Sequence, residues 1–158
     1  MKIRVGFGFD VHKLVSDRDL WLGGIKIEHS SGLLGHSDAD VLIHAICDAL
    51  LGAANFRDIG YQFPDKDEKY KNIDSKILLR DTMKLIRDAG YELSNIDATI
   101  AAEQPKLNPH IPQMKAVLAE VMAVAEEDIS IKATTTEQLG FTGRQEGMAA
   151  YATVLIYR

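Results

Sequence analysis

The chain has 158 residues, of which 46% are apolar and 26% charged, a balance that suits one compact domain over residues 1–158. Its formal net charge of -5 leaves no general positive field, so nucleic acid and anionic membranes are poor partners. The single cysteine, Cys47, cannot form an internal disulfide, and no apolar run suits a bilayer span or a signal peptide. We therefore expect a cytoplasmic protein, or a plastid protein whose leader has been removed.

Apolar periodicity predicts the secondary structure in chain order. Alternating apolar residues predict strands over 2–9 and 20–27, the second interrupted by Gly23 and Gly24. Helical spacing predicts helices over 38–54, capped by Ser37 or Asp38, and over 74–89, closed by Gly90. Residues 55–73 lack a period and are predicted to form a long surface loop. A strand over 91–102, a helix over 110–125 and strands over 129–134 and 148–157 complete the chain.

This order of elements predicts an α+β fold in which the helices pack on one face of a sheet. The other face of the sheet then has no cover within the chain. A mostly apolar second face needs a partner, and association with further copies is the simplest way to cover it.

Asp10 and His12 lie at the end of the predicted first strand. Because residues i and i+2 project from the same strand face, their side chains can meet at one ion. His44 is the best third ligand, and Asp40 or Asp48, each four residues from it, could orient its imidazole. One Asp and two His around an ion with an open fourth position are typical of catalytic zinc. The simpler interpretation is that Asp10 and His12 cap a strand and that His44 is solvated.

Two further features belong to the same helix. Cys47 lies one turn from His44 and could also bind metal, but its apolar neighbours favour a small core residue. The turn over 35–40 opens the helix, and helix starts bind anions through free N–H groups and the positive end of the dipole. His36 and Ser37 would add donors for a phosphate there, unless the turn is an ordinary cap.

A run of hydroxyls, Thr134 to Thr136, directly precedes Glu137. Hydroxyls can donate to phosphoryl oxygens, whereas Glu137 would repel a phosphate unless a divalent cation lay between them. The pattern suggests a magnesium-bridged diphosphate, with a Thr-rich strand as the alternative. Arg144 could clamp a phosphate with two hydrogen bonds or be a surface charge. The loop over 103–109 contains two prolines, and its stiff backbone could bind a nucleobase edge.

Five segments, taken together and in this order, resemble one known family. They are Gly-Phe-Asp-Val-His (8–12), Gly-His-Ser-Asp-Ala-Asp (35–40), Asp-Ile-Gly with Phe-Pro-Asp (58–65), Pro-Lys with Pro-His-Ile-Pro-Gln-Met (105–114), and Lys-Ala-Thr-Thr-Thr-Glu with Gly-Phe-Thr-Gly-Arg (132–144). The chain is thereby similar to the 2-C-methyl-D-erythritol 2,4-cyclodiphosphate synthases of the non-mevalonate isoprenoid pathway. Ala39, where Gly is common, and Lys66, where Thr is frequent, depart from the family pattern without replacing an expected ligand.

The resemblance implies a homotrimer with a mixed sheet facing its axis, helices outside and an active site at each subunit interface. It implies that 4-diphosphocytidyl-2-C-methyl-D-erythritol 2-phosphate is cyclised, with its 2-phosphate attacking the β-phosphorus and CMP leaving. It also implies zinc at Asp10, His12 and His44 and magnesium or manganese at Glu137, between the substrate phosphates. His36 and Thr135 match residues that stabilise the transition state.

The family pattern also implies contacts of Asp10, His12, His36, Thr135 and Glu137 with the substrate, and several more. The further contacts are Ser37, Asp58, Ile59, Gly60, Phe63, Pro64, Asp65, Lys66, Asp67, Ala102, Glu103, Gln104, Pro105, Lys106, Leu107, Asn108, Thr134, Thr136, Phe141 and Arg144. Within this set, 58–67 would hold the methylerythritol phosphate, and 102–108 with 134–136 the cytidine.

Two other functions stay open at this point. A metal-dependent phosphoesterase would use the same three ligands to activate water, although few side chains are placed as a general base. A binding module would hold an isoprenoid diphosphate in a pocket on the trimer axis, with Arg144 on the phosphates and Phe9 lining the channel.

Overall fold

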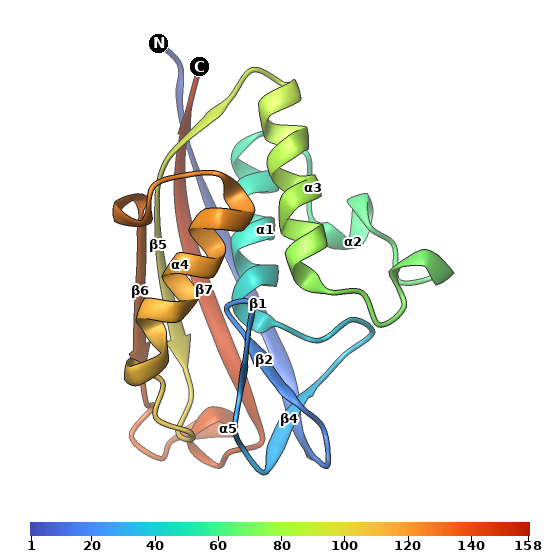
Figure 1. Cartoon of the computed structure of the whole chain (residues 1–158), viewed down its shortest axis with the longest axis vertical. Coiled ribbons are helices and arrows are strands. Elements are labelled where there is room, and N and C mark those ends of the chain that lie inside the picture. The colour runs from blue at the N-terminus through green and yellow to red at the C-terminus, as the bar shows by residue number, and fades with distance from the viewer.

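The computed structural model describes residues 1–158 and shows one mixed sheet with helices on a single face (Figure 1). The strands lie in the order β4-β1-β7-β5-β6, with β5 and β6 parallel and the other pairs antiparallel. Their bounds are β1 Ile3–Ser16, β4 Ser31–Leu34, β5 Glu92–Ala101, β6 Ile129–Thr134 and β7 Gly147–Tyr157. The expected α+β class and the one-sided placement of the helices are confirmed.

The first strand is longer than predicted. β1 continues to Ser16, because β7 pairs with it as far as Lys13 and β4 pairs with Lys13 to Ser16. Asp10 and His12 therefore lie inside a paired strand, not at its end. The predicted strand over 20–27 is a hairpin of β2 (Leu20–Leu22) and β3 (Ile25–Ile27), since Gly23 and Gly24 adopt positive φ between them.

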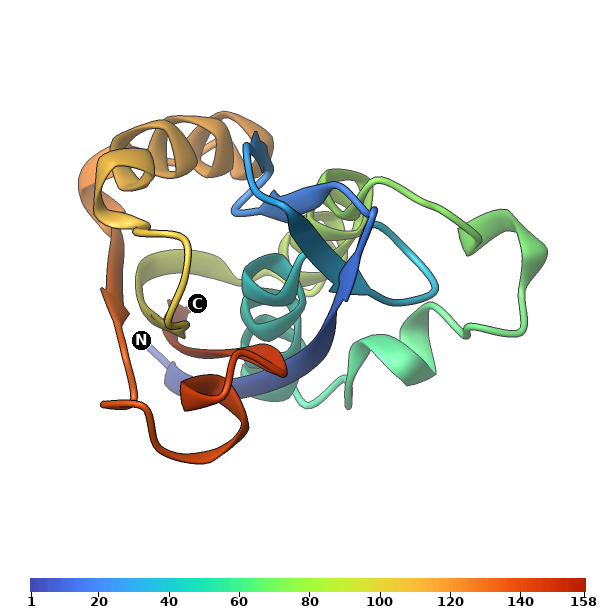
Figure 2. The ribbon, with the colours of Figure 1, turned by 90° about the horizontal axis from the view of Figure 1, so that it is seen from below.

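The main helices are α1 (Val41–Ala53), α3 (Ser75–Asp88) and α4 (Ile111–Met122), each slightly shorter than predicted. The loop predicted over 55–73 contains α2 (Ile59–Gln62) and a 3₁₀ turn (Glu68–Tyr70), and it stands away from the body of the molecule (Figure 2). The sequence patterns also missed β4 and α5 (Gly140–Gly143), because elements of four residues are too short to show a period. No helix has the length and apolarity needed to cross a membrane.

Helix α1 packs unusually close to β1. A Cβ built on Gly6 would lie 1.9 Å from the carbonyl oxygen of Ala49, and one on Gly8 would lie 1.9 Å from that of Ala45. Only glycine leaves room for a helix backbone at this distance from a strand. The close contact brings His44, on α1, within reach of the side chains of β1.

The opposite face of the sheet is apolar and exposed. Alternate residues of β1 point away from the helices and retain much of their surface, with Val5 at 68% and Phe7 at 64% exposure. Phe9 stacks on Tyr151 of β7, with ring centroids 5.2 Å apart. The bare apolar face expected from the element order is therefore present.

Candidate metal centre and substrate pocket

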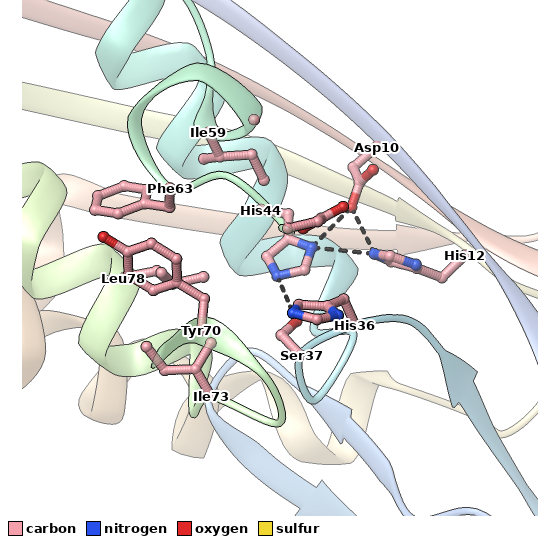
Figure 3. A pocket seen from close by; sticks show the side chains of 12 residues that line it. Asp10, His12, His36, Ser37, His44, Ile59, Phe63, Tyr70, Ile73 and Leu78 are labelled. Atoms are coloured by element: carbon pink, nitrogen blue, oxygen red, sulfur yellow. Dashed lines mark hydrogen bonds and ion pairs between the residues drawn. The ribbon is translucent and has the colours of Figure 1, made fainter. Parts of the chain in front are cut away.

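Asp10, His12 and His44 converge on one point at the wall of a pocket (Figure 3). Oδ2 of Asp10 lies 3.0 Å from Nε2 of His12 and 3.1 Å from Nδ1 of His44, and these two ring nitrogens are 3.0 Å apart. Asp10 and His12 are partly exposed, whereas His44 is buried with 6% exposure. The alternative of a solvated His44 is thus wrong.

The outer nitrogen of each imidazole is bonded in a way that leaves its inner nitrogen free. Nδ1 of His12 lies 3.0 Å from the carbonyl oxygen of Leu34, which can only accept, so this nitrogen carries the proton. Nε2 of His44 lies 2.9 Å from Oγ of Ser75 and 3.2 Å from Oγ of Ser37. If Nε2 carries the proton of neutral His44, two ring lone pairs and a carboxylate face one another, an arrangement that suits a bound cation. Such outer hydrogen bonds are typical of metal-bound histidines.

The pKa shifts of Asp10 and His44 also favour positive charge beside the Asp10 carboxylate. Burial raises the pKa of Asp10, but the hydrogen bonds and charges of His12 and His44 outweigh it and lower the pKa to about 2. Burial lowers the pKa of His44, yet the hydrogen bond to Asp10 and the nearby carboxylates raise it above the ordinary value. Without a metal, a proton on His44 partly fills the place of the cation.

Neither carboxylate expected to orient His44 contacts it. Asp40 is fully buried, caps α1 by accepting from the N–H of Ile43 at 3.1 Å, and accepts from Gly23 and Gly24 at 2.9 and 2.7 Å. Asp48 accepts from the N–H of Ile59 at 2.8 Å. Side chains four residues apart on a helix share a face. Both carboxylates nevertheless accept hydrogen bonds from backbone N–H groups, Asp40 from Gly23 and Gly24 and Asp48 from Ile59, instead of contacting His44.

The start of α1 is capped by Asp40, instead of Ser37 or Asp38. The carboxylate of Asp40 accepts from the N–H of Ile43, so one of the N–H groups that could bind an anion is already bonded. Ala39 adopts φ of 59°, the left-handed conformation that explains why Gly is common there. Cys47 is buried in the core, as expected, and burial raises its pKa to about 12.

The metal-ligating cluster opens into a pocket with one polar and one apolar side (Figure 3). His36 and Ser37 line the polar side, and Nε2 of His36 is buried without a hydrogen-bond partner. Of the expected residues in 58–67, Ile59, Gly60, Phe63 and Asp65 line the pocket. Pro64, Lys66 and Asp67 do not, and Asp58 caps α2 by accepting from the N–H of Tyr61 at 2.9 Å.

Sequence reasoning missed four residues at this site. Tyr70, Ile73 and Leu78 form the apolar side of the pocket, and Ser75 binds His44 from behind. Tyr70 and Ile73 lie in the segment predicted to be a long surface loop, and Leu78 and Ser75 lie in the predicted helix over 74–89, whose pattern indicates no contact with the site. Ser75 follows the capping residue Asp74 directly, and a small hydroxyl residue at a helix start was the one signal available.

Most of the contacts expected in 102–108 and 134–136 line a second hollow, at the ends of β5 and β6, although Thr136 does not. Its walls combine the loop after β5 with the end of β6, and comprise Ala102, Glu103, Pro105, Lys106, Leu107, Asn108, Pro109, Ala133, Thr134 and Thr135. Gln104 is exposed and outside it. Oε1 of Glu103 accepts from the N–H groups of Thr136 and Gln138, both at 3.1 Å, and so joins the two loops.

Glu137, Phe141 and Arg144 are exposed, and none of them lines the metal pocket. Nε of Arg144 donates to Oε1 of Glu146 at 2.9 Å, and Glu146 raises the pKa of Arg144. Within one chain, therefore, the structure unites the three metal ligands with His36, Ser37 and part of 58–67. It leaves the threonine run, Glu137 and Arg144 apart from them.

Comparison with known proteins gives a consistent result. The sequence model of the YgbB family matches residues 3–157. A 2-C-methyl-D-erythritol 2,4-cyclodiphosphate synthase from Parabacteroides distasonis is 83% identical over 158 residues, covering 100% of this chain and 98% of that protein.

Two solved structures share the fold. The bifunctional IspDF from Campylobacter jejuni superposes with a TM-score of 0.94 at 45% identity, and the match covers 98% of this chain but only 42% of that longer one. A 2C-methyl-D-erythritol-2,4-cyclodiphosphate synthase in its CDP-bound form superposes with a TM-score of 0.90 at 34% identity, covering 98% and 100% of the two chains. The chain belongs to the YgbB family, that of the 2-C-methyl-D-erythritol 2,4-cyclodiphosphate synthases.

Proposed function

We propose that the chain converts 4-diphosphocytidyl-2-C-methyl-D-erythritol 2-phosphate into 2-C-methyl-D-erythritol 2,4-cyclodiphosphate and CMP, at a site held by a divalent metal. The observation that carries this proposal is the convergence of Asp10, His12 and His44 beside a half-apolar pocket, in a chain 83% identical to a synthase of that name. The apolar side suits a small methylated carbon skeleton and the polar side its phosphate. We place the reaction in the cytoplasm, where the free thiol of Cys47 is stable.

The donor set fits zinc. Two imidazole nitrogens and one carboxylate oxygen lie within 4.8 Å of one another, and an open side faces the pocket. A bound divalent ion would neutralise the repulsion between the substrate phosphates and the charge that develops on the transferred phosphorus and on CMP. The three ligands hold their positions through the backbone of β1 and the buried face of α1.

In the proposed reaction, the residues of the chain position the substrate phosphates and do not act as a general base. The attacking group is a phosphate oxyanion, so the site has no proton to remove and needs to align two anions for in-line attack. His36 offers a buried ring nitrogen without a partner, which supports a contact to a phosphoryl oxygen. The absence of any Lys or Arg from the pocket wall agrees with charge neutralisation by metal. The phosphoesterase alternative would need a base for water, and few lining side chains could act as one.

A homotrimer would join the two hollows. The metal pocket and the hollow at 102–109 are separate in one chain, and the exposed face of β1 and β7 offers the apolar surface for association. We propose that a neighbouring subunit brings its threonine run to the metal pocket. Glu137 would then bind magnesium or manganese between the phosphates, Thr135 would stabilise the transition state, and 102–108 would hold the cytidine. The domain boundaries 1–158 are part of this proposal.

An isoprenoid diphosphate inside the trimer stays a prediction. Arg144, its expected contact, is paired with Glu146, so a bound diphosphate would have to compete with that carboxylate. A rise in melting temperature with geranyl diphosphate in the wild type, absent in Arg144→Ala, would support this ligand. Equal behaviour of the two proteins would exclude Arg144 from such a site.

Phosphorus NMR with the cytidyl substrate, zinc and magnesium tests the proposed reaction. We expect coupled signals of a cyclic diphosphate together with stoichiometric CMP. Linear phosphorylated products would instead show a phosphoesterase, and unchanged substrate in metal-loaded protein would show a binding module. Thr135→Ala is expected to lower kcat about 10²- to 10³-fold with little change in KM.

A further inference from the structure

A chain of hydrogen bonds runs from the back of His44 to the start of α3. Nε2 of His44 lies 2.9 Å from Oγ of Ser75, and this hydroxyl donates to Oδ1 of Asp38 at 2.5 Å. Oδ2 of Asp38 accepts from the backbone N–H of Ser75 at 2.9 Å. Ser75 is completely buried and does not line the substrate pocket, so it can act on the site only through His44 and Asp38.

The direction of the protons in this chain follows from what each group can supply. An ionised Asp38 has no proton, so the hydroxyl of Ser75 must provide the one between them. A hydroxyl has a single proton, and Ser75 therefore faces His44 with a lone pair. Nε2 of His44 must then carry a proton, and in the neutral ring the lone pair is at Nδ1.

Ser37 does not decide the tautomer. Its Oγ is 3.2 Å from Nε2 of His44 and accepts from the N–H of Ala39 at 3.1 Å. The proton of this hydroxyl is not committed elsewhere, so it can adapt to either tautomer of the ring. The hydroxyl of Ser75 cannot adapt in this way, because it donates its only proton to Asp38.

The backbone holds Ser75 in place for this contact. The N–H of Asp38 donates to the carbonyl of Ile73 at 3.2 Å, and the N–H of Asn72 donates to the carbonyl of His36 at 2.9 Å. These bonds join the segment before α3 to the turn before α1. The two helix starts therefore present Ser75 and His44 to each other at a fixed separation.

We infer that Ser75, oriented by Asp38, is a positioning residue that holds His44 as the Nε2–H tautomer. The Nδ1 lone pair is thereby directed at the ion shared with Asp10 and His12. The inference rests on the metal site proposed above, but the tautomer itself is a property of the metal-free protein. Loss of an outer hydrogen bond of this kind lowers metal affinity about 10- to 100-fold.

Nitrogen-15 NMR of histidine-labelled, metal-free protein at alkaline pH measures the tautomer directly. We expect His44 to be protonated at Nε2 in the wild type. In Ser75→Ala the ring should move toward Nδ1–H, which can donate to Asp10, and the zinc dissociation constant should rise about 10- to 100-fold. Asp38→Asn, which removes the charge that orients Ser75, should shift the tautomer in the same direction even if Ser75→Ala does not fold.

Two controls separate this role from general damage to the fold. Asp74→Ala removes the cap of the same helix without touching His44, and it should change neither the tautomer nor the zinc affinity. Ser37→Ala should leave the Nε2–H tautomer in place.

The tautomer assignment and the metal site can be refuted separately. A wild-type tautomer and zinc affinity in both Ser75→Ala and Asp38→Asn would overturn the inference while leaving the metal site intact. A tautomer that follows Ser75 in a protein that fails to bind zinc would instead overturn the metal site and leave the tautomer assignment standing.

Discussion

Replacement of Gly8 by alanine should damage both stability and the metal site. The new Cβ would lie 1.9 Å from the carbonyl oxygen of Ala45, and an ordinary contact begins near 3.4 Å, so α1 must move away from β1 by about 1.5 Å. A backbone carbonyl inside a helix cannot rotate out of the way. We therefore place the cost at the upper end of the range for overpacking, about 3 kcal/mol.

The displacement reaches the metal ligands directly. Ala45 follows His44 on α1, and Gly8 precedes Asp10 by two residues on β1. Because metal–ligand distances tolerate only about 0.2 Å, a shift of this size should also weaken zinc binding at least 10-fold.

Denaturant unfolding and thermal melting at fixed protein concentration measure the first effect, with an expected fall in Tm of about 6–12 °C. Gly52→Ala is the matched control, because Gly52 lies on the exposed side of α1 with nothing within 4 Å of a new Cβ. This control should raise stability by about 0.5–1 kcal/mol. An unchanged Tm in Gly8→Ala would refute the claim that the two glycines set the distance between α1 and β1.

Further predictions concern the metal ligands, the pH dependence and the thiol. His44→Ala should lose zinc and activity, and metal analysis showing full occupancy in this variant would exclude His44 as a ligand. The pKa of Asp10 is lowered to about 2 in the folded protein, so its contribution to the stability of metal-free protein is present above pH 4 and is lost as the pH falls toward 2. Unfolding curves of wild type and Asp10→Asn across this range should therefore converge in acid. Cys47, with its pKa raised to about 12, should resist alkylation in the folded protein and react only after denaturation.

Local patterns in the sequence were enough for the layers of the fold and for the convergence of the three candidate metal ligands. β6 was placed with its observed bounds, and α1 and α3 within a few residues, because each carries a clear apolar period. Asp10 and His12 share a strand face whether the strand ends at residue 9 or 16, so the error in its length did not affect their convergence. His44 could be added because it lies on a helix.

The partners of those ligands were not predictable in the same way. Spacing placed Asp40 and Asp48 beside His44, but both carboxylates bind backbone N–H groups from other elements. Ser75 contacts His44 although the two residues are 31 positions apart in the sequence, and a periodic pattern gives no information on a contact at that distance. Contacts that depend on how two helix starts meet are a property of tertiary packing, and a single sequence contains little local signal for them.

The charge on the pocket wall supports the proposed role of a metal in the chemistry. Asp10 and Asp65 line the pocket, no Lys or Arg does, and the start of α1 is already occupied by Asp40. A substrate with several phosphate charges would therefore be repelled by the metal-free site. At the proposed site, binding of anions would become favourable once cations join Asp10, His12 and His44 or bridge the phosphates themselves. The usual protein devices for holding phosphate, a free helix start and an arginine fork, do not line this pocket. Cations that permitted binding would therefore also be in place to stabilise the transferred phosphorus.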